Sequence, residues 1–169
     1  MGPLVAVIGG SSPTVGEASL AEDVGRLLAE AGAVLICGGR GGVMEAACRG
    51  AKAVGGTTIG ILPGRDQRDA NPYVDIPIVT GIGEARNAII AHTAEVAIAV
   101  GGSYGTLSEI AYVLGLGKPL IGLRTWVVER EGHSAASIVR VETATDAVEE
   151  ALARLKSAGG MSSRLAKES

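Results

Sequence analysis

The stretch VAIAVGGSYGTLSEIAYVLG, residues 96–115, contains the pattern that decides the fold. Its first five residues are apolar without alternation, which is typical of a strand covered on both faces. Two glycines follow, and apolar residues then recur at helical spacing over residues 104–116. A buried strand, a glycine loop and a helix are the repeating unit of a parallel α/β sheet.

The same unit recurs along the whole chain. Further apolar runs predict strands at 4–8, 33–37, 57–62, 76–79, 119–123 and 138–141. Helical patterns lie between them, at 17–31, 42–54, 83–94 and 144–156. This alternation predicts a Rossmann-like α/β fold, a doubly wound, mostly parallel sheet flanked by helices on both faces. We expect one domain over residues 1–157 and a disordered tail at 158–169, where the sequence is polar and lacks periodicity.

Composition excludes several classes of partner. The chain has 169 residues, a formal net charge of −3 and no long cluster of Lys and Arg, so nucleic acid is not an expected partner. The apolar run at residues 4–8 is far shorter than the roughly 20 residues that span a bilayer, which predicts a cytoplasmic protein without a membrane partner. Cys37 and Cys48 have no metal-binding or redox spacing, so we expect two buried thiols and neither a metal nor a disulfide framework. We also expect no bound cofactor.

Three of the predicted strand-to-helix loops are rich in glycine, at 9–16, 38–42 and 101–106. Glycine lets backbone N–H groups approach an anion closely, and the start of the following helix adds its unpaired N–H groups. The loops therefore favour a phosphate site, although each taken alone also fits a tight turn. The expected binding residues in them are Gly10, Ser11, Gly39, Gly41, Gly42, Gly101, Gly102, Ser103, Tyr104, Gly105 and Thr106. The sequence has neither a Walker A motif nor a GxGxxG fingerprint, which argues against NTPase and NAD(P) chemistry.

Three segments resemble motifs of the LONELY GUY (LOG) family. GGSYGTLSE (101–109) is similar to its GGxGTxxE signature, with one extra loop position, and GGRGGVM (38–44) is similar to its GGxxGxM loop, which adds Met44 to the expected site. EARNAII (84–90) stands where that family has an Arg-containing helix, and the resemblance covers roughly residues 4–123.

The resemblance implies a Rossmann-like 5′-phosphoribohydrolase that cleaves the N-glycosidic bond of cytokinin nucleoside 5′-monophosphates, with Arg86 and Glu109 as the catalytic pair. Two positions depart from the family pattern, because Val100 replaces a proline and Asn87 replaces a lysine. Related proteins include nucleotide-binding proteins and carriers of the molybdenum cofactor, a pterin that bears a phosphate. The label "lysine decarboxylase", which many relatives carry, does not fit, since no lysine here is a convincing Schiff-base residue.

Helix geometry predicts where the two charged residues point. A stripe of Leu107, Ile110, Ala111 and Leu114 is expected to face the sheet, with Glu109 on the opposite side. In the preceding helix the expected sheet-facing stripe is Ala85, Ala88, Ile89 and His92, with Arg86 on the other face. Both outer faces are partly apolar, which predicts a homo-oligomer, a dimer or a dimer of dimers, whose seam borders the site.

Two functions remain open from the sequence. In a hydrolase, Glu109 would stabilise the oxocarbenium-like transition state and activate water, while Arg86 would hold the phosphate or offset charge on the departing base. In a non-catalytic nucleotide or molybdenum cofactor carrier, the same loops would hold the ligand and Glu109 would anchor a hydroxyl or an N–H edge. Both readings predict a phosphorylated, nucleotide-like small molecule as the partner.

Overall fold

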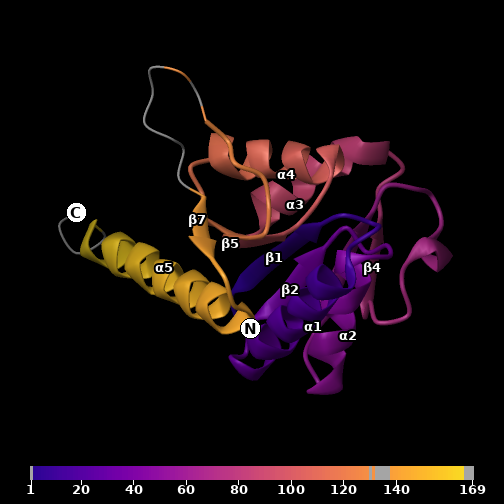
Figure 1. Ribbon diagram of the computed structural model, residues 1–169, viewed down its shortest axis with the longest axis horizontal. Helices are drawn as coiled ribbons and strands as arrows, with labels where there is room; N and C mark the ends of the chain where they lie inside the picture. Colours follow the sequence, from indigo (N-terminus) through magenta and orange to yellow (C-terminus); the bar gives the residue numbers. More distant parts are fainter. Residues whose placement is uncertain (1, 130, 132–137, 166–169) are drawn as a thin grey trace.

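The protein folds as one twisted parallel sheet with helices on both faces (Figure 1). The computed structural model describes residues 2–129, 131 and 138–165, and from residue 158 onward the backbone alone. Its strands are β1 (Leu4–Gly9), β2 (Val34–Cys37), β3 (Thr58–Leu62), β4 (Ile76–Val79), β5 (Val96–Val100), β6 (Leu120–Leu123) and β7 (Val139–Val141). Its helices are α1 (Val15–Glu30), α2 (Val43–Ala53), α3 (Asn87–Thr93), α4 (Tyr104–Gly115) and α5 (Ala144–Leu165), with the short 3₁₀ turns η1 (Gln67–Asp69) and η2 (Gly83–Arg86).

The strand order places a chain reversal in the middle of the sheet. The seven strands lie in the order β4-β3-β2-β1-β5-β6-β7, and every neighbouring pair is parallel. From β1 the chain winds outward to β4, then returns to β5 on the other side of β1 and winds outward again. In such a sheet the loops after the two central strands diverge and leave a crevice beyond their carboxyl ends, the usual position of a ligand.

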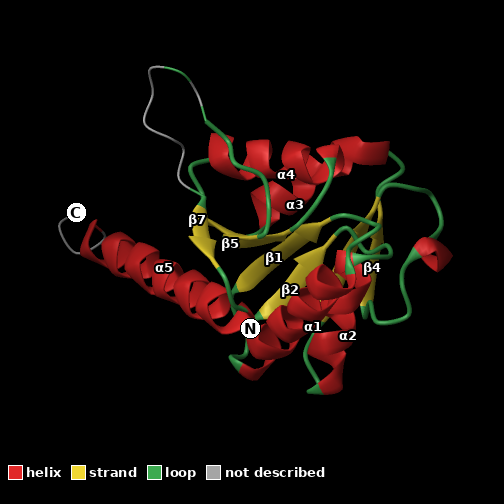
Figure 2. Cartoon of the chain, in the orientation of Figure 1, coloured by secondary structure: helices red, strands yellow, loops and turns green. Residues whose placement is uncertain are grey.

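The two faces of the sheet carry separate apolar cores. Val5 and Val7 of β1 pack with α1, α2 and α5, whereas the alternating Ala6 and Ile8 pack with α3 and α4. Figure 2 shows this arrangement, with α3 and α4 above the sheet and the other three helices below it. Alternate side chains of a strand point to opposite faces, so a strand covered on both faces must be apolar throughout.

The predicted α/β fold is confirmed, and the largest difference in element bounds lies at the C-terminus. All seven predicted strands are present within one or two residues of their expected bounds. Helix α5, by contrast, runs to Leu165 instead of ending at 156, so residues 158–165 of the expected tail are helical. Residues 166–169 of that tail lie outside the described residues. In the described part of the chain, none of the helices is both long and apolar enough to cross a bilayer.

Candidate anion-binding site at the centre of the sheet

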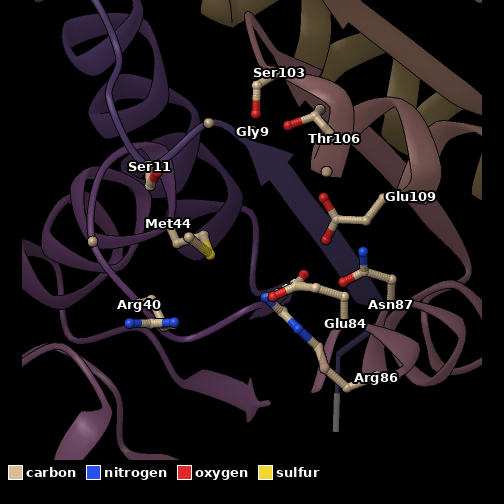
Figure 3. Close-up of a pocket in the computed structure, with 13 residues that line it drawn as sticks. Gly9, Ser11, Arg40, Met44, Glu84, Arg86, Asn87, Ser103, Thr106 and Glu109 are labelled. Carbon is tan, nitrogen blue, oxygen red and sulfur yellow. Dashed lines mark ion pairs between the residues drawn. The ribbon is translucent and has the colours of Figure 1, made fainter. Parts of the chain in front are cut away.

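A cavity of about 310 Å³ opens beyond the carboxyl ends of β1 and β5, where the chain reversal predicts a crevice. The loops after β1, β2 and β5, the turn η2, and the first turns of α2, α3 and α4 all contribute to its wall. Its lining residues are Gly9, Gly10, Ser11, Arg40, Gly41, Met44, Glu84, Arg86, Asn87, Ser103, Gly105, Thr106 and Glu109. In Figure 3 Thr106, Glu109 and Asn87 project into this space from one side, and Met44 and Arg40 face them from the other.

The structure brings most of the expected site residues to this cavity. Both members of the expected catalytic pair line it, as do the expected residues Gly10, Ser11, Gly41, Met44, Ser103, Gly105 and Thr106. Five expected residues are not in its lining. They are Gly39, Gly42, Gly101, Gly102 and Tyr104.

Each of those five residues has a different place in the fold. Gly39 packs against β3, Gly42 lies at the start of α2 beside the β1 loop, and Gly101 lies against the side chain of Glu17. Gly102 lines a smaller neighbouring cavity. Tyr104 is 80% exposed, and its ring lies against that of Trp126 with 5.5 Å between the ring centres.

Glu109 lies on the buried face of α4, which corrects the expected orientation of this helix. The buried residues of α4 are Thr106, Glu109, Ile110 and Val113, whereas Ala111 of the expected sheet-facing stripe is exposed. Helix α4 is therefore rotated about its axis relative to the expectation, so that its buried face includes Glu109. Only 6% of Glu109 is exposed, because its side chain closes one wall of the cavity.

The segment before β5 also differs from its expected orientation. Residues 83–94 do not form one helix, since the 3₁₀ turn η2 precedes α3. A 3₁₀ turn has three residues per turn instead of 3.6, so it shifts the phase of the faces that follow. The buried residues are consequently Arg86, Asn87, Ile90 and Ala91, whereas His92, expected in the core, is exposed.

The guanidinium group of Arg86 is buried against the backbone of the β2 loop. A Cβ built on Gly38 would collide with both terminal nitrogens of Arg86, so only glycine leaves room for this side chain. The one ion pair of Arg86 among the described residues joins its Nη2 to Oε2 of Glu84 at 4.0 Å, and Glu84 is largely exposed. Arg86 is thus a buried cation whose charge is only weakly compensated by the protein.

Four buried side-chain atoms within the described part of the chain have no hydrogen-bond partner, and all four belong to this cavity. They are Nε and Nη1 of Arg86, Oδ1 of Asn87 and Oγ1 of Thr106. An unsatisfied buried polar group costs roughly 1–3 kcal/mol, and such groups are rare in native proteins. Their clustering in one cavity makes this cavity the candidate ligand site.

Burial changes the protonation of Glu109. Loss of solvent raises the pKa of its carboxyl from the ordinary 4.5 to about 8, although the positive charge of Arg86 opposes this rise and the charge of Glu84 adds to it. At neutral pH most molecules therefore carry a neutral Glu109 carboxyl. The charge of Arg86 then has no ionised carboxylate beside it in the cavity except that of Glu84.

Helices α2 and α4, whose first turns line the cavity, have no side-chain cap at their N-termini. Helix α1 has a complete capping box, in which Thr14 and Glu17 exchange hydrogen bonds with each other's backbone N–H groups. The first residues outside α2 and α4, Gly42 and Ser103, make no side-chain capping bond. The N–H group of Val43 at the start of α2 donates to the carbonyl oxygen of Gly10 at 3.0 Å. The remaining first-turn N–H groups and the positive dipole ends of α2 and α4 have no side-chain acceptor, which suits an anion.

Sequence reasoning missed four lining residues and one supporting residue. Arg40, Glu84 and Asn87 lie in segments already singled out, and the charges of the first two were the signal that could have marked them. Gly9 ends β1 and lines the cavity by its backbone. Gly38 makes room for Arg86, and no sequence signal shows which distant side chain a glycine accommodates.

The fold and the cavity together define a Rossmann-like protein with a candidate ligand site at the reversal point of its sheet. Residues 3–151 match the model of the SLOG cluster 4 family, and the chain belongs to that family. The family is part of the LOG-like Rossmann superfamily that the sequence motifs predict.

Individual relatives agree with this assignment. The chain is 51% identical over 109 residues to an uncharacterised protein of Archaeoglobus fulgidus, an alignment that covers 64% of this chain and 72% of the other. The molybdenum cofactor binding protein of Rippkaea orientalis is 44% identical, with a TM-score of 0.72 and 75% and 78% of the two chains covered. The molybdenum cofactor carrier protein of Chlamydomonas reinhardtii is 35% identical, with a TM-score of 0.80 and 91% and 99% covered.

Proposed function

We propose that this protein is a non-catalytic binding protein for a phosphorylated small molecule of the nucleotide or molybdenum cofactor class. The observation that carries the proposal is the set of four unpartnered buried atoms around one cavity, beside two uncapped helix N-termini. A phosphate offers acceptors to Arg86, Thr106 and the free N–H groups, and its charge balances the buried guanidinium. The likeness to the Rippkaea and Chlamydomonas proteins favours a phosphate-bearing pterin among such ligands.

Hydrolysis of a nucleoside 5′-monophosphate is the second candidate function. Arg86 and Glu109 support it, since they line the same cavity. The raised pKa of Glu109 argues against it, because a neutral carboxyl neither stabilises an oxocarbenium ion nor accepts a proton from water at pH 7. Asn87, which replaces the family's lysine, adds no positive charge that would lower this pKa.

Titration with defined probes tests the proposed binding function. Inorganic phosphate and the isolated molybdenum cofactor are titrated into the full chain and followed by calorimetry. We expect both to bind, and we expect Arg86→Met to weaken both more than tenfold because charge-assisted hydrogen bonds are lost. Normal binding by the Arg86→Met variant would refute the role of this cavity.

A product assay separates binding from hydrolysis. The protein is incubated with AMP and with cytokinin monophosphates, and free base is measured by chromatography. We expect no release of base while binding is intact. Base release that disappears in a Glu109→Ala variant would replace the binding proposal with the hydrolase.

We also infer that the protein is a homo-oligomer, a dimer or a dimer of dimers. The outer face of α4 exposes Tyr112 and Leu116, and Ile89 of α3 lies exposed on the same layer. Apolar residues gathered on two adjoining helices are typical of a contact between protein copies. Light scattering after size exclusion should show more than one chain per particle, and Tyr112→Glu should shift the particle toward the monomer.

A further inference from the structure

A second cavity adjoins the anion-binding cavity and differs from it in charge. It has a volume of about 230 Å³ and is lined by Gly10, Ser11, Ser12, Pro13, Glu17, Gly102 and Ser103. Three of these residues, Gly10, Ser11 and Ser103, also line the main cavity, so the two cavities adjoin each other along these residues. The main cavity contains Arg40 and Arg86 together with Glu84 and the mostly neutral Glu109. The only charged residue that lines the second cavity, among the residues that the structure describes, is Glu17.

The loop after β5 is shaped around the Glu17 side chain. A Cβ built on Gly101 would collide with Oε1 of Glu17, and the backbone of Gly101 has a φ of +53°, which favours glycine. The other carboxylate oxygen, Oε2, accepts the hydrogen bond from the backbone N–H of Thr14 at 2.8 Å. Within the described residues no donor is bonded to Oε1, so one carboxylate oxygen stays available beside the cavity.

The charges of the two cavities fix the direction in which an elongated ligand can bind. A phosphate in the second cavity would be repelled by Glu17, and the N-terminus of α1 is already capped there. A phosphate in the main cavity meets Arg86, Arg40 and two uncapped helix N-termini. The part of the ligand that reaches the second cavity must instead carry hydrogen-bond donors, because an ionised carboxylate only accepts.

We propose that the ligand spans both cavities, with its phosphate in the main cavity and a pair of N–H or O–H donors bound to Glu17 in the second. This inference rests on the proposed binding function and adds the ligand's orientation and its second recognition element. Such donors occur in two chemical sources, the vicinal hydroxyls of a ribose and the amino-lactam edge that guanine shares with a pterin. Glu17 thereby selects phosphate esters of these groups over bare phosphate.

The test is a matrix of four probes and four proteins, read by calorimetric titration. The probes are inorganic phosphate, ribose 5-phosphate, 5′-GMP and 2′,3′-dideoxy-GMP, which separate the hydroxyls from the base. The proteins are the unmodified chain, Glu17→Gln, Arg86→Met and the control Glu30→Gln, the same exchange at an exposed end of α1. Glutamine also forms a capping box, so Glu17→Gln removes the charge while it preserves the start of α1.

We expect Glu17→Gln to lower the affinity for at least one of the three extended probes about tenfold and to leave the affinity for inorganic phosphate unchanged. Loss confined to ribose 5-phosphate and GMP assigns the donors to the ribose, and loss confined to GMP and dideoxy-GMP assigns them to the heterocycle. Equal weakening of all four probes, or of none, would overturn the inference. Probes that bind and depend on Arg86 would then still support the proposed function, whereas the failure of every probe to bind would refute both.

Discussion

Replacement of Glu109 by glutamine tests the central electrostatic feature of the site. Glu109 is 6% exposed and its pKa is raised to about 8 from 4.5, mainly by loss of solvent. Below pH 4.5 the residue is protonated in both the folded and the unfolded chain, and its full stabilising contribution is present. Between pH 4.5 and 8 the unfolded chain loses the proton and the folded chain keeps it, so the free energy of unfolding falls as pH rises.

The size of this effect follows from the two pKa values. The stability of the unmodified protein should fall relative to Glu109→Gln by about 1.4 kcal/mol for each pH unit in this window, and by about 5 kcal/mol over the whole of it. That is a large share of the 5–15 kcal/mol that stabilises an ordinary domain. The variant should therefore be more stable than the unmodified protein at pH 8.

Urea unfolding at pH 5, 6, 7, 8 and 9 measures this difference directly. The exposed exchange Glu30→Gln serves as the control, and its stability should run parallel to that of the unmodified protein across the series. Parallel curves for Glu109→Gln and the unmodified protein would refute the reasoning. Glu109 would then be ionised in the folded protein, and the hydrolase would regain its carboxylate.

Three further substitutions test other parts of the structure. Gly38→Ala should displace the Arg86 guanidinium and weaken phosphate binding more than tenfold in calorimetry, at a cost of about 1–3 kcal/mol in stability; unchanged affinity would contradict this. Lys118→Met should cost about 2 kcal/mol in urea unfolding, since its ammonium donates to three carbonyl oxygens at the end of α3 at 2.6–2.8 Å. Thr14→Ala should cost about 1 kcal/mol in the same assay, because it removes the acceptor for the backbone N–H of Glu17.

The strands were predictable because burial on both faces imposes an unambiguous pattern. Residues 96–100 are apolar throughout, and the structure places β5 at the same residues with both faces covered. Glycine loops mark where each central strand ends, so the site's place at the carboxyl edge also followed from the sequence. These features depend on local sequence and on rules of chain connection that leave few alternative topologies.

The helix faces were not predictable by the same reasoning. A polar residue on a helix is ordinarily assigned to the solvent side, yet Thr106 and Glu109 are buried because they line a cavity. The orientation of Arg86 depended on η2, a 3₁₀ turn that apolar periodicity does not reveal. Both errors arise at the site itself, where the cavity and not the local sequence pattern determines which side chains are buried.

The electrostatics of the cavity are opposite to those of the chain as a whole, and this contrast bears on what the cavity binds. The protein carries a formal net charge of −3, yet its central cavity has Arg40, Arg86 and two positive helix ends against one exposed carboxylate, Glu84. The other carboxyl, Glu109, is mostly neutral at pH 7. An anion that binds beside Arg86 further disfavours ionisation of Glu109, so capture of a phosphate and retention of this proton reinforce each other. If the cavity binds a phosphate as proposed, we expect its affinity to be highest where Glu109 is protonated and to fall as the pH rises above 8.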